Sequence, residues 1–207
     1  VLFRSVLNQI TKLGLDDSTA VFFIGDNGGL STSEGSPTSN LPFRGGKGWI
    51  YEGGIREAFL ARCPGVTTPG SVSSEPVCST DFYPTILEYC GLPLKPNQHL
   101  DGQSLIPLMS GEERLSRENL FWHYPHYSNQ GGFPAAALRN RDWKLIERFE
   151  DGRVHLYHLK DDPGERKDRS KDFPDRVMRM RENLHRWYRE VDAKFLQPKD
   201  GRQPWRP

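Results

Sequence analysis

Hydrophobic positions in the first half of the chain follow two different periods. Residues 5–14 place their apolar side chains at helical spacing, and Gly14 is positioned to end that helix. The run at 20–24 is apolar at every position, which is typical of a strand covered on both faces. Strand-forming residues return around 50–61, and residues 79–90 are predicted to form a helix that begins at a Ser/Thr/Asp cap.

A connection rich in proline and glycine, residues 91–118, separates this part from a second pattern. Four short runs of strand-forming residues follow, at 119–124, 132–139, 143–149 and 154–159. Asp151-Gly152 lies between the last two runs and favours a hairpin. Residues 174–190 then carry apolar side chains at helical spacing, with Pro174 suited to the first turn.

The two patterns together predict an α/β protein with a small α+β subdomain. The first part is a helix–strand–loop–strand–helix piece of an α/β layer, and the second is a four-stranded antiparallel sheet with one packed helix. We expect domain boundaries that give residues 1–110, residues 111–195 and an extended tail at 196–207, because the tail is polar and rich in proline.

Composition narrows the possible partners. The 207 residues are enough for a sizeable core and a smaller appendage. Lys+Arg 28 against Asp+Glu 27 gives no reason to expect nucleic acid or an anionic membrane, and no apolar run is long enough to suggest a membrane span. The three cysteines have no metal-ligand spacing, and buried thiols are the simplest interpretation. A Cys78–Cys90 bridge stays open, because spacing alone does not determine it.

Candidate metal ligands directly follow the apolar run at 20–24. Ligands of α/β sheets gather beyond the carboxyl ends of strands, and Asp26 and Asn27 lie at such a place in the stretch GDNGG. A carboxylate and an amide carbonyl are hard oxygen donors, which suit Ca²⁺ or Mg²⁺. The alternative is an Asp-Asn-Gly turn without a ligand, because such turns are common.

A candidate anion-binding residue follows in the stretch RGGKG. Lys47 lies between glycines, so it has few local partners and is free to hold an anionic oxygen. The stretch is not a phosphate-binding P-loop, because Gly48 stands where Ser or Thr is required. A solvated surface lysine is the alternative interpretation.

Two histidines are candidates for substrate contacts. His123 and His126 lie among aromatic residues in FWHYPHY, where imidazoles could donate hydrogen bonds to a sugar and the rings could stack on it. A packed strand with satisfied histidines is the alternative.

In their order along the chain, GDNGG, RGGKG and YEGGIR strongly resemble the formylglycine-dependent sulfatases of the alkaline-phosphatase superfamily. STDFYPTILEYCGLP, LDGQSLIPLMSG, RDWKLIER and HLYHLKDDPGER resemble later segments of the same family, so the resemblance runs from about residue 5 to about 195. It implies an alkaline-phosphatase-like α/β sandwich in which Asp26 and Asn27 ligate the cation. It also implies that Lys47, 21 positions after Asp26, binds the sulfate.

The resemblance implies an arylsulfatase-like hydrolase of sulfate esters, acting on a sulfated carbohydrate or an aryl sulfate with Ca²⁺ or Mg²⁺. The family's nucleophile motif, C/S-x-P-x-R, is absent from these residues. We therefore expect residues 1–110 to be the C-terminal part of a catalytic domain and 111–195 its C-terminal subdomain. The missing N-terminal half of the domain would carry the formylglycine, and the piece alone would be inactive.

Three further expectations depend on the same resemblance. The runner-up activity is that of a phosphatase or phosphonate hydrolase of the same superfamily, since a hard cation and a lysine also suit phosphoryl groups. A non-catalytic glycan-binding protein that keeps only the fold is the alternative outside enzymes. The family also implies that the parent protein is periplasmic or extracellular.

Overall fold

The computed structural model describes residues 2–32 and 38–197, which form two compact units. The first unit combines the residues up to Ile24 with Ala58–Arg117, and the second combines Gly25–Glu57 with the residues from Glu118 onward. The segment that holds GDNGG and RGGKG thus belongs with the C-terminal sheet. The domain boundaries expected for the complete protein remain a prediction, and most of the expected tail lies outside the described residues. Among these residues, no helix is long and apolar enough to cross a bilayer.

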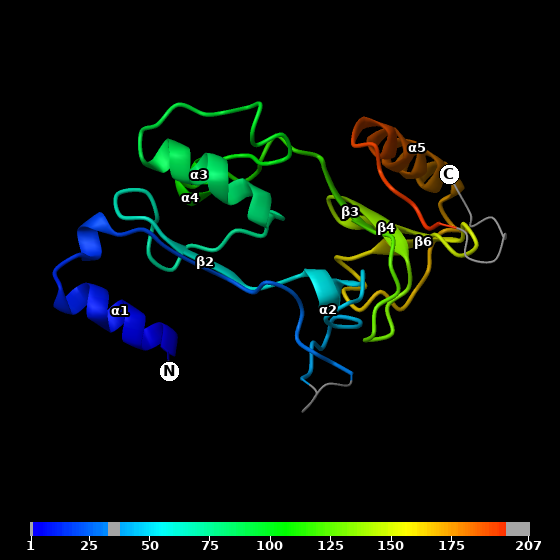
Figure 1. Ribbon diagram of the computed structural model, residues 1–207, viewed down its shortest axis with the longest axis horizontal. Helices are drawn as coiled ribbons and strands as arrows, with labels where there is room; N and C mark the ends of the chain where they lie inside the picture. Colours follow the sequence, from blue (N-terminus) through cyan, green and yellow to red (C-terminus); the bar gives the residue numbers. More distant parts are fainter. Residues whose placement is uncertain (1, 33–37, 198–207) are drawn as a thin grey trace. The chain divides into compact units, whose positions relative to one another are not determined.

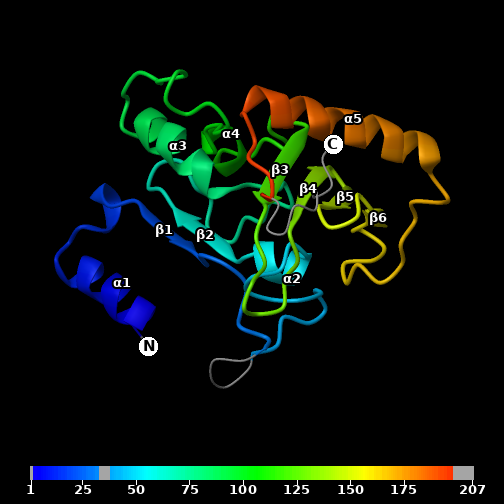
Figure 2. The same ribbon diagram turned by 45° about the vertical axis from the view of Figure 1, so that its right-hand side comes forward.

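The first unit consists of helices and one small sheet (Figure 1). Its elements are α1 (Leu2–Lys12), β1 (Val21–Ile24), β2 (Phe59–Arg62), α3 (Phe82–Tyr89) and α4 (Ile106–Met109), with 3-10 turns at Asp16–Ser18 and Ser79–Asp81. β1 and β2 pair antiparallel, and α3 lies beside α4 (Figure 2). The first helix, the first strand and the third helix were predicted from the sequence, whereas α4 was not.

The apolar strand β1 is only partly covered in the first unit. Phe22 packs with Phe59 of β2 and with Phe82 of α3, at ring centroid distances of 6.5 and 5.6 Å. Phe23 contacts the ring of Phe3 at 4.9 Å but remains 40% exposed, and Leu60 of β2 is 57% exposed. Apolar positions of the hairpin thus remain open to solvent, which agrees with a strand made to be covered on both faces by neighbours that the described residues do not supply.

A buried carboxylate fixes the long connection of the first unit. Asp81 accepts hydrogen bonds from both terminal nitrogens of Arg117, at 2.7 and 2.8 Å, and from the amides of Cys78 and Gln103. These bonds join the start of α3 to the far end of the connection. The open question of a bridge is also settled, because all three cysteines are free.

The second unit contains the predicted antiparallel sheet and its helix. Four strands pair in sequence order, and one long helix follows them. They are β3 (Asn119–Tyr124), β4 (Ala135–Asn140), β5 (Trp143–Arg148), β6 (Val154–His158) and α5 (Pro174–Glu190). The hairpin predicted at Asp151-Gly152 joins β5 to β6, with Gly152 at φ 67°.

The strand predicted around 50–61 is wrong in its first half. Glu52–Ile55 forms the single helical turn α2, and only Phe59–Arg62 is extended. The cause lies in Gly53 and Gly54. Side chains at these positions would collide with backbone carbonyls of residues 44–49, so the glycines permit a close packed turn instead of a strand face.

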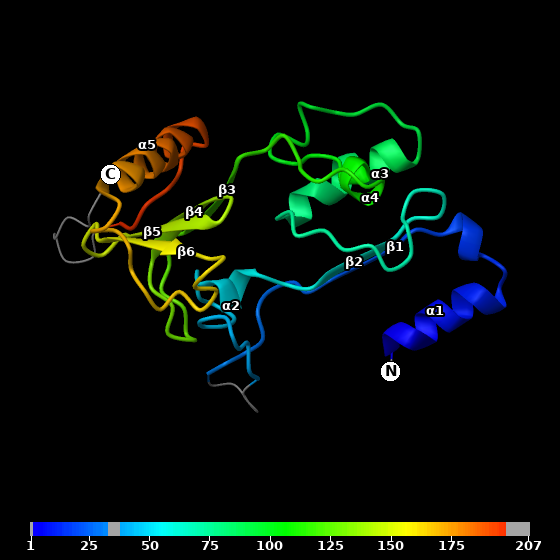
Figure 3. The same cartoon turned by 180° about the vertical axis from the view of Figure 1, so that it is seen from behind.

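The sheet of the second unit is covered on both faces (Figures 1 and 3). α5 packs on one face, and α2 with the residues just before it lies on the other. The two cores are Ala136, Leu138, Leu145, Phe149, Leu156, Met180, Leu184 and Tyr188 on the α5 side, and Ile50, Tyr51, Ala135, Ala137, Ile146, Tyr157 and Leu159 on the α2 side. Residues of β4 and β5 alternate between the two cores, as the pleat requires.

Candidate cation and anion site

The residues predicted to bind the cation and the anion are carried by two short turns of the second unit. The acidic turn, residues 25–29, follows β1 in the chain and carries Asp26 and Asn27. The lysine turn, residues 44–48, carries Lys47. Both turns have glycine at three of five positions, and the reason is visible in how their backbones meet.

Backbone and amide bonds join the two turns directly. The amide of Lys47 donates to the carbonyl of Gly29 at 3.2 Å. The side-chain amide of Asn40 donates to both turns, to Gly29 at 2.8 Å and to Gly45 at 3.1 Å. A Cβ at Gly46 would overlap the Gly29 carbonyl oxygen, so only glycine allows this approach. The two turns thus form one packed element.

Helix α2 is hydrogen-bonded to both turns. The amide of Gly28 donates to the Gly54 carbonyl at 3.0 Å, and the amide of Gly53 donates to the Arg44 carbonyl at 2.8 Å. A Cβ at Gly28 would overlap the Gly53 carbonyl oxygen. The position of α2 therefore determines how the acidic turn and the lysine turn are held.

Negative charge gathers at the acidic turn. Asp26 is exposed and Asn27 is half-buried, while the Glu57 carboxylate lies against Gly25, where a Cβ would overlap its Oε2. Burial, and then the neighbouring charge of Asp26, raise the pKa of the Glu57 carboxyl. Two neighbouring carboxylates favour a bound cation, because a cation would relieve their repulsion.

The donor set fits part of a hard-cation site. Asp26 and Asn27 supply side-chain oxygens of the kind that calcium and magnesium prefer, yet calcium takes about six to eight oxygens. Within residues 2–32 and 38–197, no group of three or more His, Cys, Asp or Glu side chains is arranged to hold a metal ion. Further ligands would have to come from outside these residues or from water.

The lysine side chain is free to meet an anion. Lys47 is exposed, and its backbone amide is used in the contact between the turns. The loop after β3 packs on the neighbouring residues, because a Cβ at Gly132 would overlap the Gly48 carbonyl oxygen and the Trp49 indole donates to the Gln130 carbonyl at 2.9 Å. This loop also carries His126, which is exposed.

His123 lies on the opposite face of the sheet. Its Nε2 is 2.6 Å from the Lys194 carbonyl oxygen, and its ring packs with those of Phe149, Tyr188 and Phe195 at 5.2 to 5.6 Å. Burial lowers the pKa of its imidazole. These contacts account for His123 by packing on the α5 side. Its predicted role in substrate binding finds no support in them and stays a prediction.

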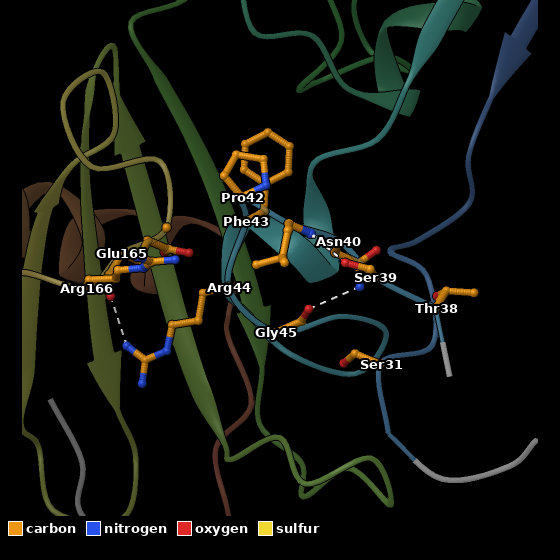
Figure 4. A pocket seen from close by; sticks show the side chains of 12 residues that line it. Ser31, Thr38, Ser39, Asn40, Pro42, Phe43, Arg44, Gly45, Glu165 and Arg166 are labelled. Carbon is orange, nitrogen blue, oxygen red and sulfur yellow. Dashed lines mark hydrogen bonds between the residues drawn. The ribbon is translucent and has the colours of Figure 1, made fainter. Parts of the chain in front are cut away.

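A groove of about 660 Å³ with a mixed polar and apolar lining adjoins the lysine turn (Figure 4). Its lining comprises Ser31, residues 38–45 and Gly164, Glu165 and Arg166. Arg44 is one of these lining residues. Its guanidinium donates a hydrogen bond to the Glu165 carbonyl at 3.0 Å and stacks 3.9 Å from the centre of the Tyr51 ring. Arg44 and Gly45 of the lysine turn line the groove, whereas Lys47 is not among its lining residues.

Comparisons with known proteins identify the family of this chain. The protein family described as N-sulphoglucosamine sulphohydrolase, C-terminal, matches residues 45–192. A sulfatase of Formosa agariphila is 35% identical over 189 residues, which cover 84% of this chain and 34% of that protein. Human arylsulfatase A is 36% identical over 187 residues, covering 78% and 35%. The chain thus spans about a third of the length of the curated relatives it matches.

A solved structure supports the same relationship. The crystal structure of Ps i-CgsB in complex with k-i-k-neocarrahexaose aligns with a TM-score of 0.77 and 25% identity, over 94% of this chain and 42% of that one. The match covers residues of both the first unit and the second unit. This chain therefore belongs to the sulfatase family, whose alkaline-phosphatase-like α/β fold it shares and whose C-terminal part it matches.

Proposed function

We propose that the complete protein hydrolyses sulfate esters in an arylsulfatase-like reaction. One observation carries the proposal: the amide of Lys47 is bonded to the acidic turn, so an exposed ammonium and two oxygen donors for a cation belong to one packed element. Positive charge from two sources is what a sulfate ester needs as negative charge builds on the group that is transferred. Membership of the sulfatase family agrees with this interpretation.

Each site residue has a defined task in this proposal. Asp26 and Asn27 bind Ca²⁺ or Mg²⁺, and Lys47 holds a sulfate oxygen from another side. The cation, when bound, acts as a Lewis acid on the sulfate oxygens. A formylglycine, whose sequence motif these 207 residues do not contain, would be the nucleophile. Lys47 is therefore the residue of this chain with both a catalytic and a substrate-binding role.

A sulfated carbohydrate is the substrate class that the surroundings of Lys47 suit best. The groove beside the lysine turn has a mixed polar and apolar lining, which suits a sugar ring, and the loop that carries His126 packs on the same turn. The related Ps i-CgsB is described in complex with an oligosaccharide. An aryl sulfate is the smaller alternative, and a periplasmic or extracellular location follows from the family.

The runner-up function is a phosphatase or phosphonate hydrolase, because a hard cation and an ammonium also stabilise phosphoryl groups. The deciding experiment measures how fast the complete protein hydrolyses the sulfate, phosphate and phosphonate esters of one sugar, first with calcium and then with a chelator. The proposal expects the sulfate ester to be hydrolysed fastest, and it expects the chelator to abolish this activity. Preferred turnover of a phosphorus ester would replace it by the runner-up, and binding without any turnover would favour a non-catalytic glycan-binding protein.

The 207-residue chain offers a separate check on its own. The described residues hold no cluster of three or more His, Cys, Asp or Glu side chains for a metal ion, so this chain alone should show no sulfatase turnover and no tight calcium binding by calorimetry. Measurable turnover by the isolated chain would mean that its site is complete and that the expected N-terminal half is not needed.

A further inference from the structure

In the second unit, three charged side chains are buried together between the sheet and helix α2. This buried ion cluster consists of Glu52 at the start of α2, Lys144 of β5 and Glu165 after β6, and Arg139 of β4 joins it at 3.4 Å from Glu52 Oε2. Lys144 is 0% exposed, and its Nζ lies 3.0 Å from Glu52 Oε1 and 2.9 Å from Glu165 Oε1. The backbone amide of Glu52 also donates to Glu165 Oε2 at 2.6 Å. One lysine on the sheet thus connects two segments that lie far apart in the sequence.

Stability alone gives a poor account of such a cluster. Taking charges out of water costs several kcal/mol per ion, and apolar side chains of similar volume are often at least as stable in their place. Glu165 also adopts a φ of 50°, the left-handed region that a residue with a side chain rarely occupies. Strain and buried charge at one place point to a requirement for defined geometry.

The geometry in question is that of the two site turns. Glu52 opens α2, and the next two residues of α2, Gly53 and Gly54, are the ones bonded to the lysine turn and the acidic turn. The carbonyl of Glu165 additionally accepts a bond from Arg44 of the lysine turn. Every one of these links runs through hydrogen bonds or ion pairs, which fix direction as well as distance.

We propose that Lys144 is a positioning residue of the site. By holding Glu52 and Glu165, it sets the place of α2, and α2 in turn holds the acidic turn and the lysine turn at one fixed separation. Lys144 touches neither substrate nor cation in this account. The expected loss of catalytic rate rests on the proposed function. The expected loosening of the two turns does not depend on it.

The same strand provides a matched control. Glu147 of β5 is also 0% exposed, but it faces α5, where Arg181 Nε lies 2.6 Å, His185 Nε2 2.9 Å and the Tyr188 hydroxyl 3.1 Å from its carboxylate. Glu147→Gln therefore disturbs a buried charge cluster of similar size with no bond to either site turn. Lys144→Met and Glu147→Gln should both lower the thermal midpoint of the complete protein.

The experiment compares these variants by hydrogen exchange and by steady-state kinetics on a sulfated sugar below the thermal midpoint. We expect Lys144→Met to speed exchange in residues 25–29 and 44–56 and to lower kcat by about 10–100-fold, as small misplacements of catalytic groups do. Glu147→Gln should speed exchange in α5 and leave kcat and both turns unchanged. Unchanged exchange in the turns of folded Lys144→Met overturns the proposal, whether or not the protein is a sulfatase.

Glu165→Gln keeps the test decisive if Lys144→Met does not fold. Glutamine preserves the shape and an acceptor for the Glu52 amide, but it removes one charge from the cluster. Faster exchange in both turns together with a lower kcat supports the proposal. Wild-type exchange and kcat in this variant contradict it. Faster exchange in a protein without sulfatase turnover would support the positioning role and reject only the proposed activity.

Discussion

Strand β5 buries a charged side chain on each face, and the two faces differ in what those charges hold. Within the described residues, the carboxylate of Glu147 bonds to α5, through Arg181, His185 and Tyr188. Lys144 is bonded to Glu52 and Glu165, which lead to the turns of the candidate site. Equal burial therefore has unequal consequences. The partners of a buried charge, more than its depth, indicate whether function depends on it.

The apolar parts of the two faces repeat this difference. On the α5 side, long side chains such as Leu184 and Phe149 form a core that a helix closes. On the α2 side, Ile50 and Tyr51 lie directly before α2 and bring the site segment down onto the sheet. We expect changes on the α2 side to alter activity and changes on the α5 side to alter mainly stability.

The largest effect is expected at the acidic turn. Asp26→Ala in the complete protein removes the charged ligand of the proposed cation, so metal-dependent turnover should be lost. The measurement is the rate of sulfate release at saturating calcium. Asp17→Ala, which removes an exposed carboxylate in the first unit, should keep the wild-type rate. Calcium-dependent turnover by Asp26→Ala would remove this residue from the site.

Lys47→Ala should have the next largest effect. Removal of one anion-stabilising donor costs about 2.7–4 kcal/mol of transition-state stabilisation, or about 10²–10³ in kcat. The matched control is Lys160→Ala, another exposed lysine, in the turn after β6. Equal kcat/KM values for Lys47→Ala and Lys160→Ala would show that the lysine turn has no part in the chemistry.

A core change on the α5 face should separate stability from activity. Leu184 is 0% exposed, and Leu184→Ala should lower the free energy of unfolding by about 2–5 kcal/mol through the cavity it leaves. Urea unfolding measures that loss, and the kcat per folded molecule should stay at the wild-type value. A kcat that falls as far as that of Lys47→Ala would mean that the two faces are not independent.

The smallest expected effect is a pH dependence from His123. Burial lowers the pKa of its imidazole in the folded protein below the unfolded value of about 6.5, so the unfolded chain binds a proton more readily. Its contribution to stability is complete above pH 6.5 and declines as the pH falls from there toward the lowered pKa. Unfolding free energies measured across this range should decline less steeply for His123→Gln, and equal slopes would contradict the assignment.

The sequence predicts best where one short-range rule decides the structure. The 3.6-residue period of 174–190 gives the observed bounds of α5, and Asp151-Gly152 gives the hairpin. Asp26 and Lys47 became candidates through residue type, one after a strand and the other between glycines, and the resemblance then added their interval. The close packing of their two turns depends on glycine. These features need little knowledge of distant parts of the chain.

The features that were missed depend on distant partners. The sequence around Lys144 is that of a common strand and does not indicate that the lysine is buried. Its burial depends on Glu52 and Glu165, which lie 92 and 21 positions away in the sequence. His123 was associated with substrate because it lies among aromatic residues at the start of the C-terminal subdomain. Its strand was predicted with the observed bounds, and alternation along β3 puts its side chain on the α5 side. The predicted contact with substrate stays untested.

The central claim is that the acidic turn binds a cation and the lysine turn binds the anion beside it. A crystal structure of the complete protein with calcium and a sulfated sugar tests it most directly. The account predicts calcium about 2.3–2.6 Å from oxygens of Asp26 and Asn27, and Lys47 Nζ within about 3 Å of a sulfate oxygen. A sulfate bound elsewhere, or a cation without contact to Asp26 and Asn27, would contradict it.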